Sequence, residues 1–413
     1  MGDRQIVVVG AGVVGAAVAL ALVRDGHRVL LFDREGPAAG ASFGNAGAIV
    51  NGSCAPTAMP GVWKEAFRSI GNPLGPVSIR PAYLPRALPW LIRFMADGRQ
   101  SRVARIARDL HALSRRAVPS WRDLTAGTEL ARYLHEGGWL KVYESEPSFA
   151  KTAAARRLMD TVCSPYELLS ADDIRDLEPH LAPVFEYGIF QKDSLRCPDP
   201  AGLVKAMVEH AVANGAEFRK AAVTGLDVDG EGVLVRGPAG PVRAGKVVIA
   251  AGAWSGALAA QVGNRVPLDT ERGYHMMLPK GSERLLSRPV MNGDRSFVLS
   301  PMADGIRMTS QVEIAGLDAP PSYARIRQLL PEARRMLPAL DAREASVWMG
   351  CRPSLPDSLP VIGASKSTPN VLLAFGHQHL GLTLAAATAL AIASLIAGRD
   401  PGFDLGPYRP GRY

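Results

Sequence analysis

The sequence predicts an α/β fold in which a Rossmann-like unit is combined with a second region built on an antiparallel sheet. Near the start of the chain, an apolar run of β-branched residues, 6–9, leads into a glycine-rich turn and an alanine-rich helix. A second apolar run, 246–250, ends in small residues, which is typical of a strand in the middle of a parallel sheet. Between residues 274 and 308, short apolar segments alternate with turns in an antiparallel pattern.

The glycine-rich turn has the pattern GxGxxG, formed by Gly10, Gly12 and Gly15. Gly10 permits the tight turn, Gly12 lets the backbone approach a pyrophosphate, and Gly15 lets the helix pack against the strand. The N–H groups at the start of the helix, at Val13 and Val14, then face the phosphates, with the helix dipole behind them. The pattern predicts a dinucleotide-binding turn.

A second apolar strand, 28–32, follows the helix and ends at Asp33. A carboxylate at this place accepts hydrogen bonds from the hydroxyl groups of an adenosine ribose. The order of strand, turn, helix, strand and acid therefore favours dinucleotide binding over an ordinary βαβ unit with a chance acid. The following segment, 40–49, consists mostly of small residues that permit close backbone approach. We expect it to lie along the cofactor, with a flexible surface loop as the alternative.

Length and composition predict a globular chain of two or three domains. The chain has 413 residues, of which 47% are hydrophobic and 21% charged. Its four cysteines are far apart and lack metal-ligand spacing, which predicts a reducing compartment and no structural metal. The net charge of +8 is not accompanied by a nucleic-acid motif, so we expect no nucleic-acid partner. The alanine-rich run 383–397 is 15 residues long, shorter than the ~18 residues of a membrane span, and we expect no transmembrane helix.

Residues 71–98, rich in Pro, Trp and Arg, leave the nucleotide-binding region. In the next segment, apolar residues recur at helical spacing from Val103 to Ala117, and arginines cover much of the other face. Such a basic amphipathic helix can dock on an anionic membrane together with residues 90–92. Alternatively, it packs its apolar stripe into the protein and leaves the arginines in water. We favour the second interpretation, because a charged face is usually only solvated.

The remaining elements form two excursions from the nucleotide-binding region and the return to it. The sequence predicts strands at 138–143, 223–228, 232–235 and 241–243, helices at 148–163, 203–213 and 322–336, and a capped turn at 170–173. The last strand, 371–375, runs into a turn, 376–383, and then into a final helix. The N-terminus of this helix can face an anionic or electron-rich group.

Taken together, these motifs resemble those of the D-amino-acid oxidase-like family of FAD-dependent oxidoreductases, and within it the bacterial D-amino-acid dehydrogenases. The matching segments are GAGVVG with Asp33, ASFGNAG at 41–47, VVIAAGAWS at 247–255, RPSLPDSLPVIG at 352–363 and FGHQHLGLT at 375–383. They occur in the family's order and span the chain. The resemblance implies non-covalently bound FAD, an FAD-binding domain of residues 1–75, 195–268 and 348–413, and a substrate-binding domain of residues 76–194 and 269–347.

The resemblance also implies which residues contact FAD. Besides the glycine-rich turn, they are Asp33 and Arg34 at the ribose; Ser42, Asn45, Ala46 and Gly47 at the middle of the cofactor; Val223 at the adenine; Ala251, Gly252 and Trp254 after the central strand; and Gly376, Gln378, His379, Leu380, Gly381 and Thr383 at the flavin. At the flavin, the positive end of the final helix stabilises the reduced, anionic ring.

By the same resemblance, Arg352 binds the substrate. Its guanidinium group is suited to hold an α-carboxylate in two places while hydride leaves the α-carbon. Tyr274 is implied as a second carboxylate contact, with a core tyrosine as the alternative. His377 and His379 are assigned polarity and positioning rather than proton abstraction, with a purely structural role as the alternative. Cys351 lies where relatives that oxidise sarcosine tether flavin, but the Arg-Pro pair after it resembles the non-covalent dehydrogenases.

The resemblance thus implies a cytoplasmic enzyme that oxidises a D-amino acid to the imino acid and passes the electrons to a quinone-type acceptor. Candidate substrates include D-proline and hydroxy-D-proline, and peripheral contact with the inner face of the cell membrane is a further expectation. One alternative is an oxidase of glycine, sarcosine or another secondary amine that uses O2. Others are a non-catalytic flavin-relay subunit of a hetero-oligomer and a binding protein recruited to membranes by the arginine-rich helix.

Overall fold

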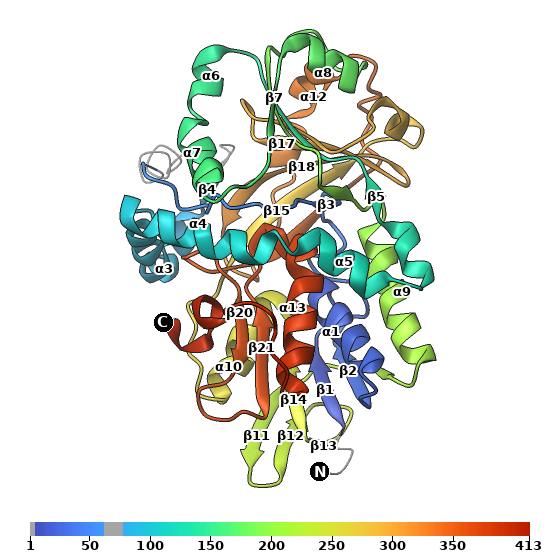
Figure 1. Cartoon of the computed structure of the whole chain (residues 1–413), viewed down its shortest axis with the longest axis vertical. Helices are drawn as coiled ribbons and strands as arrows, with labels where there is room; N and C mark the ends of the chain where they lie inside the picture. The colour runs from blue at the N-terminus through green and yellow to red at the C-terminus, as the bar shows by residue number, and fades with distance from the viewer. Residues whose placement is uncertain (1–4, 62–76) are drawn as a thin grey trace.

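The computed structural model describes residues 5–61 and 77–413, and the described strands form a parallel sheet, a large antiparallel sheet and two small sheets (Figure 1). The strands of the parallel sheet are β1 (Ile6–Val9), β2 (Val29–Asp33), β10 (Glu217–Lys220), β14 (Lys246–Ile249), β20 (Val361–Ala364) and β21 (Val371–Phe375). Their order is β10-β2-β1-β14-β21-β20, and every neighbouring pair is parallel except β20 with β21. The sheet therefore joins the start, the middle and the end of the chain.

Helices cover one face of the parallel sheet and a small sheet covers the other. The first face packs against α1 (Val13–Arg24), α5 (Ala117–Thr125), α9 (Pro200–Ala213) and α13 (Gly381–Ile396), which share one hydrophobic core. The second face packs against α10 (Ser255–Gln261) and the three-stranded sheet of β11 (Gly225–Asp229), β12 (Gly232–Arg236) and β13 (Val242–Ala244). Because β1, β14 and β21 are covered on both faces, their sequences are almost continuously apolar.

The large sheet, called the antiparallel sheet because only its pairs β6 with β16 and β4 with β18 are parallel, forms the other half of the molecule, at the top of Figure 1. Its strands are β4 (Val77–Ile79), β6 (Trp139–Tyr143), β7 (Glu167–Leu169), β8 (Tyr187–Gln191), β15 (Asp269–Met277), β16 (Val290–Asn292), β17 (Phe297–Met302), β18 (Gly305–Ile314) and β19 (Ser346–Ser354). The order is β19-β15-β18-β17-β16-β6-β8-β7, with β4 beside β18. A further small sheet is formed by β3 (Ala48–Ile49), β5 (His135–Glu136) and β9 (Leu195–Arg196). The mixed α/β fold with several sheets confirms the predicted fold class.

The other helices are α3 (Leu84–Asp97), α4 (Gln100–Ser114), α6 (Glu146–Ala150), α7 (Ala153–Thr161), α8 (Ala171–Leu177), α11 (Ala324–Arg327) and α12 (Leu330–Met336). The 3₁₀ turns are η1 (Pro81–Tyr83), η2 (Glu129–Tyr133), η3 (Gly252–Trp254), η4 (Ser282–Leu285), η5 (Gln378–Leu380), η6 (Gly406–Tyr408) and η7 (Pro410–Arg412). The predicted capped turn is a capping box at Ser170 and Asp173, which begins α8. The predicted helices 148–163 and 322–336 are each divided into two. In the second case Pro331 lies in the first turn of the new helix α12, where the N–H that proline lacks is not needed.

The basic amphipathic helix is α4, which crosses the middle of the molecule beside α5 (Figure 1). The apolar residues of its stripe, Val103, Ile106, Leu110 and Leu113, are all buried. This confirms the interpretation that the stripe packs into the protein. Ile106, Leu110 and Leu113 share the core of α1 and α13, although residues 76–194 are predicted to belong to the substrate-binding domain. The start of the Pro-rich excursion, 71–76, lies outside the described residues.

The final helix continues from its 3₁₀ turn, so that Gln378–Ile396 spans 19 residues. By length and composition alone, this segment could cross a membrane. In the fold it packs against α1 and α5, and 67% of its most apolar window is buried. It is therefore the central helix of the parallel half, and it is longer than the 15-residue run 383–397 on which the expectation of no transmembrane helix rested.

Candidate active site

A cavity of about 1030 Å³ lies between the parallel and the antiparallel sheet and is lined from both. Most of the sequence-predicted site residues line it: Gly10, Gly12, Val13, Val14, Asp33, Arg34, Ser42, Asn45, Ala46, Val223, Ala251, Gly252, Trp254, Tyr274, Arg352, His377, Gln378, His379, Leu380, Gly381 and Thr383. Gly15, Gly47 and Gly376 are not among the lining residues. The cavity volume lies at the upper end of what single small ligands require, which leaves room for a dinucleotide with a small substrate.

The glycine-rich turn leaves no space for side chains. A Cβ atom on Gly10 would lie 2.4 Å from the carbonyl oxygen of Ala250, and one on Gly15 would lie 1.8 Å from that of Gly10. Gly10 also has a φ of +107°, in the region that favours glycine. The first turn of α1 carries no acidic residue, so the helix dipole and its free N–H groups can receive an anionic group. The N–H of Val13, predicted to face the phosphates, instead donates to the hydroxyl of Ser42. The turn therefore fits the pyrophosphate of a dinucleotide.

Asp33 closes β2 and joins it to the glycine-rich turn. One carboxylate oxygen accepts a hydrogen bond from the N–H of Ala11 at 2.8 Å, and the other accepts from the N–H groups of Glu35 and Gly36, each at 2.9 Å. Next to it, the guanidinium of Arg34 lies 3.8 Å above the ring centre of Trp254. Both charged side chains line the cavity at this end, where the sequence predicts the ribose.

The small-residue loop 40–47 is fixed to both halves of the protein. The hydroxyl of Ser42 accepts a hydrogen bond from the N–H of Val13 at 2.9 Å, at the start of α1. From β18, the buried Arg307 donates to the carbonyl oxygens of Phe43 at 3.0 Å and of Asn45 at 2.7 Å. The sequence offers no signal for Arg307, because 262 residues separate it from Asn45 along the chain. These contacts contradict the alternative of a flexible surface loop and fix the loop along the cavity.

Trp348 is a second residue that sequence reasoning missed. Its indole lies between two glycines: a Cβ atom on Gly44 or on Gly350 would each come within 1.9 Å of the indole ring. The ring also stacks on His275, with 5.2 Å between the ring centres. Trp348 lies on β19, the strand that also carries Arg352, and forms a rigid wall of the cavity.

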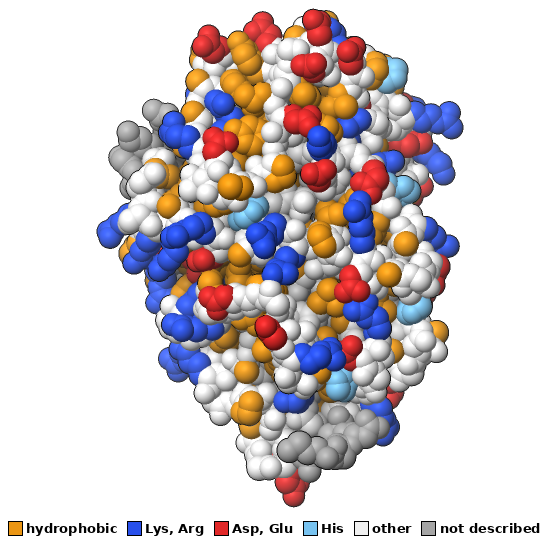
Figure 2. Space-filling model, in the orientation of Figure 1, with side chains coloured by type: hydrophobic (Ala, Val, Ile, Leu, Met, Phe, Trp, Pro, Cys, Tyr) orange, Lys and Arg blue, Asp and Glu red, His pale blue; other side chains and the backbone are white. Residues whose placement is uncertain are grey.

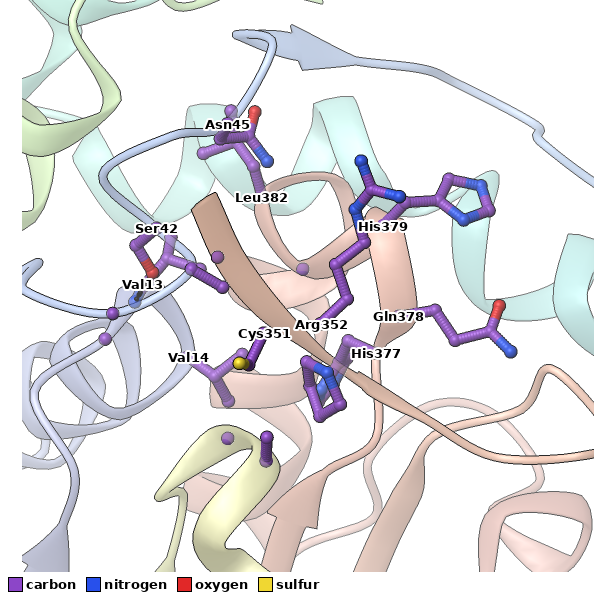
Figure 3. Close-up of a pocket in the computed structure, with 18 of the residues that line it drawn as sticks. Val13, Val14, Ser42, Asn45, Cys351, Arg352, His377, Gln378, His379 and Leu382 are labelled. Carbon is purple, nitrogen blue, oxygen red and sulfur yellow. Dashed lines mark hydrogen bonds between the residues drawn. The ribbon is translucent and has the colours of Figure 1, made fainter. Parts of the chain in front are cut away.

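Arg352 lies on β19, opposite Glu271 of the neighbouring strand β15. Its guanidinium lies over Gly273, where a Cβ atom would come within 2.2 Å of an Nη atom. Burial lowers the pKa of Arg352, and the charge of Glu271 opposes that shift. Burial likewise raises the pKa of Glu271, against the effect of Arg352. Figure 3 shows the arginine side chain extending into the cavity toward His379.

Tyr274 lines the cavity, but its hydroxyl is engaged elsewhere. It donates to the carboxylate of Glu313 at 2.6 Å and accepts a hydrogen bond from the N–H of Ser322 at 3.1 Å. Burial and the hydrogen bond to Glu313 raise the pKa of Tyr274 to about 12. Glu313 is also paired with Arg80 at 2.8 Å. This geometry favours a core tyrosine, the alternative that the sequence left open, over a second carboxylate contact.

The two histidines of the flavin-side turn have different surroundings. His377 is buried, and this burial lowers its pKa to about 3. Its Nε2 atom lies 3.0 Å from the hydroxyl of Thr388. The side chain of His379 is exposed on the cavity wall, where the enclosing protein and the cations Arg352 and Lys141 lower its pKa to about 4. Both imidazoles are therefore neutral near pH 7. His377 fits the structural alternative, and His379 fits a positioning role.

The glycines that do not line the cavity support its wall from behind. A Cβ atom on Gly47 would lie 2.4 Å from the carbonyl oxygen of Cys197, and one on Gly376 would lie 2.4 Å from the side chain of Leu355. The cavity is also lined by Trp139, Lys141 and Gln191, which sequence reasoning did not identify. Within residues 5–61 and 77–413, no group of three or more His, Cys, Asp or Glu could hold a metal ion.

Comparison with known proteins agrees with this geometry. The family model described as FAD dependent oxidoreductase (DAO) matches residues 5–395. The chain is 37% identical to a D-amino-acid oxidase of Bradyrhizobium diazoefficiens over 99% of both chains, and 32% identical to D-amino acid dehydrogenase 2 of Mesorhizobium japonicum over 97% of this chain and 98% of that one. Its fold resembles a glycine oxidase from Geobacillus kaustophilus with a TM-score of 0.75 and 22% identity over 99% of both chains. The chain therefore belongs to the DAO family of FAD-dependent oxidoreductases.

Proposed function

We propose that this protein oxidises D-amino acids, with Arg352 as the residue that binds the substrate α-carboxylate. The observation that carries the proposal is a buried guanidinium group in a cavity that also contains a dinucleotide-binding turn. The names of the most similar relatives support the substrate class. Bound FAD would supply the hydride acceptor for oxidation at the α-carbon; the substrate then becomes an imino acid, which for a primary amine water hydrolyses to a 2-oxo acid and ammonia. Proline-type D-amino acids, whose nitrogen is secondary, remain within this substrate class.

The residues of the cavity position the substrate rather than remove its protons. Arg352 orients the carboxylate with two parallel hydrogen bonds, and Gly273 leaves the space for its guanidinium. His377 and His379 have pKa values of about 3 and 4, so they are weak bases near neutral pH. The amine must therefore reach the site in its neutral form. The turn 376–383 and the start of α13 offer N–H groups that favour the anionic, reduced flavin.

Anaerobic mixing of the FAD-loaded protein with D- and L-amino acids tests this proposal directly. We expect the flavin absorbance near ~450 nm to fall with D-amino acids and to remain with their L-enantiomers, because the cofactor takes up the electrons. Glycine and sarcosine serve as the comparison for the alternative of an oxidase of glycine, sarcosine or another secondary amine. Reduction by those two amines alone would replace the proposal by that alternative, and no reduction by any amine would favour the flavin-relay subunit.

For the electron acceptor, we propose a quinone-type molecule reached from the cytoplasmic face of the membrane. Helix α3 carries Leu88, Ile92 and Met95 with exposed fractions of 49%, 54% and 39%. Exposed arginines surround them on α3 and α4: Arg86, Arg93, Arg99, Arg102, Arg105 and Arg108. Figure 2 shows Lys and Arg side chains gathered on this flank of the molecule. Exposed apolar residues among cations are typical of a surface that contacts anionic lipid.

The variant Ile92→Glu with Met95→Glu is expected to reduce binding to anionic vesicles about tenfold or more, because both apolar side chains would lose their contact with lipid. Co-sedimentation with phosphatidylglycerol vesicles measures the effect. Val212→Glu is the matched control, since Val212 is 44% exposed on α9. Equal binding of the double variant and the parent protein would contradict the membrane contact.

A second acceptor is favoured by one observation: the relative with 37% identity is named an oxidase. In this case O2 takes the electrons from the reduced protein. Readmission of air after anaerobic reduction distinguishes the two acceptors. Reoxidation within seconds, with formation of H2O2, supports O2. Slow reoxidation in air and fast reoxidation by a soluble quinone support the quinone.

A further inference from the structure

Lys141 brings a cation into the cavity that the mechanism does not use. It lies on β6, where side chains alternate between the two faces of the sheet. Leu140 and Val142 point into the hydrophobic core, whereas Trp139 and Lys141 line the cavity. Across the sheet, Lys141 lies opposite Met291, which in turn lies opposite Val298. Both of these residues also line the cavity.

No carboxylate forms an ion pair with Lys141 in the part of the chain that the structure describes. Burial lowers the pKa of Lys141, so that a carboxylate bound beside it would favour its ammonium form. The titratable groups that influence its pKa or are influenced by it are Cys54 and His379. Burial raises the pKa of Cys54 to about 11, so that its thiol is neutral. The imidazole of His379 is also neutral near pH 7, as described above. Neither neighbour compensates the ammonium group of Lys141.

The charged residues that line the cavity are separated by sign along its length. Its acidic lining residues, Asp33 and Glu35, lie at the end of β2, beside the glycine-rich turn. The opposite end contains the two cations Arg352 and Lys141, both close enough to His379 to lower its pKa. Glu271 lies behind Arg352 on β15 and does not line the cavity. With Glu271 counted against Arg352, Lys141 is the remaining group that can carry a positive charge at this end, among the residues that the structure describes.

We propose that Lys141 binds a second carboxylate of the substrate, so that acidic D-amino acids such as D-aspartate and D-glutamate are preferred. This inference rests on the proposed function, in which Arg352 holds the α-carboxylate. An acidic amino acid whose amine is neutral, as the reaction requires, carries two carboxylates, which match the two side chains Arg352 and Lys141. A neutral side chain would instead displace water from the ammonium group without replacing its hydrogen bonds, which disfavours such substrates.

Isosteric amides test the role of the charge at constant size. We expect kcat/KM for D-glutamate and D-aspartate to exceed that for D-glutamine and D-asparagine by about 10- to 100-fold, the effect of one charge-assisted hydrogen bond. Lys141→Met is expected to bring this ratio to about one, mainly through the KM of the acidic substrates. Lys141→Arg should retain part of the preference. Lys205→Met, at an exposed position of α9, removes the same charge outside the cavity and should leave the ratio unchanged.

A binding measurement separates this inference from the proposed function. Succinate, which the protein cannot oxidise as an amino acid, is titrated against its monoamide, succinamate, and the flavin absorbance reports binding. Tighter binding of succinate in the parent protein, lost in Lys141→Met, supports the second carboxylate site even where D-amino acids are not oxidised. The inference would be overturned if the parent protein bound succinate and succinamate with equal affinity, or if Lys141→Met left the ratio of the two affinities unchanged. An equal loss of rate for acids and amides would do the same, since it assigns Lys141 to the cofactor.

Discussion

Replacing Arg352 by methionine is expected to raise the KM for D-amino acids by about 100- to 1,000-fold while FAD remains bound, because two charge-assisted hydrogen bonds to the α-carboxylate are lost. The arginine extends from β19 over Gly273, and its partner in the strand ladder is Glu271. Cofactor binding depends on other segments, chiefly the glycine-rich turn and the loop 40–47. Steady-state kinetics and the flavin absorbance of the purified variant measure the two effects separately.

The control for this prediction addresses Glu271, which would otherwise remain as a buried charge without its cation. Breaking a buried pair by removing one partner costs about 3–5 kcal/mol, so the single variant will also be less stable. The double variant Arg352→Met with Glu271→Gln removes both charges and should recover much of that stability without recovering the KM. A double variant with near-normal KM would exclude Arg352 from the substrate site.

Gly10→Ala is expected to abolish FAD binding and to destabilise the protein by about 2–5 kcal/mol, the sum of backbone strain and overpacking. The added methyl group would lie 2.4 Å from the carbonyl oxygen of Ala250 on the adjoining strand, and the backbone would keep a φ of +107°. The backbone of Gly10 and that of Ala250 cannot move apart without disturbing the central strands β1 and β14. Flavin fluorescence of the protein and its denaturant midpoint report the two effects.

Gly26→Ala is the matched control, because Gly26 has a φ of +83° but no atom within 4 Å of an added Cβ. The Gly26→Ala variant therefore contains the backbone strain without the steric overlap. We expect its free energy of unfolding to fall by about 1 kcal/mol and its FAD content to remain normal. If Gly10→Ala and Gly26→Ala lost similar amounts of stability, conformational strain rather than close approach of backbone segments would explain the requirement for glycine at the turn.

The dinucleotide-binding turn could be predicted from the sequence because its determinants are local. Strand, turn, helix and acid all lie within residues 6–33, and each is recognised by its own periodicity or by glycine spacing. The apolar strand 246–250 could be placed in a parallel sheet for the same reason, whereas the family resemblance assigned 371–375 to the same domain. Likewise, the periodicity of α4 was sufficient to identify its buried stripe.

The inner end of the cavity could not be predicted in this way, because long-range strand pairing assembles it. Lys141 faces the cavity only because β6 pairs with β16 in a register that turns Trp139 and Lys141 to this side. Arg307 and Trp348 contact the loop 40–47 from strands that follow it by more than 250 residues. The local sequence patterns of β6, β18 and β19 do not predict these contacts.

The packing of α1 against α13 has a consequence for how the protein is made. These helices are far apart in the sequence, and β1 is joined to β21 through β14, so the parallel sheet is incomplete until β21 has left the ribosome. Contacts of such large sequence separation are slow to form. During synthesis, the apolar residues of β1 and α1 therefore lack partners that are translated much later. Chaperone dependence of the nascent chain, and loading with FAD only after release, are the expected results.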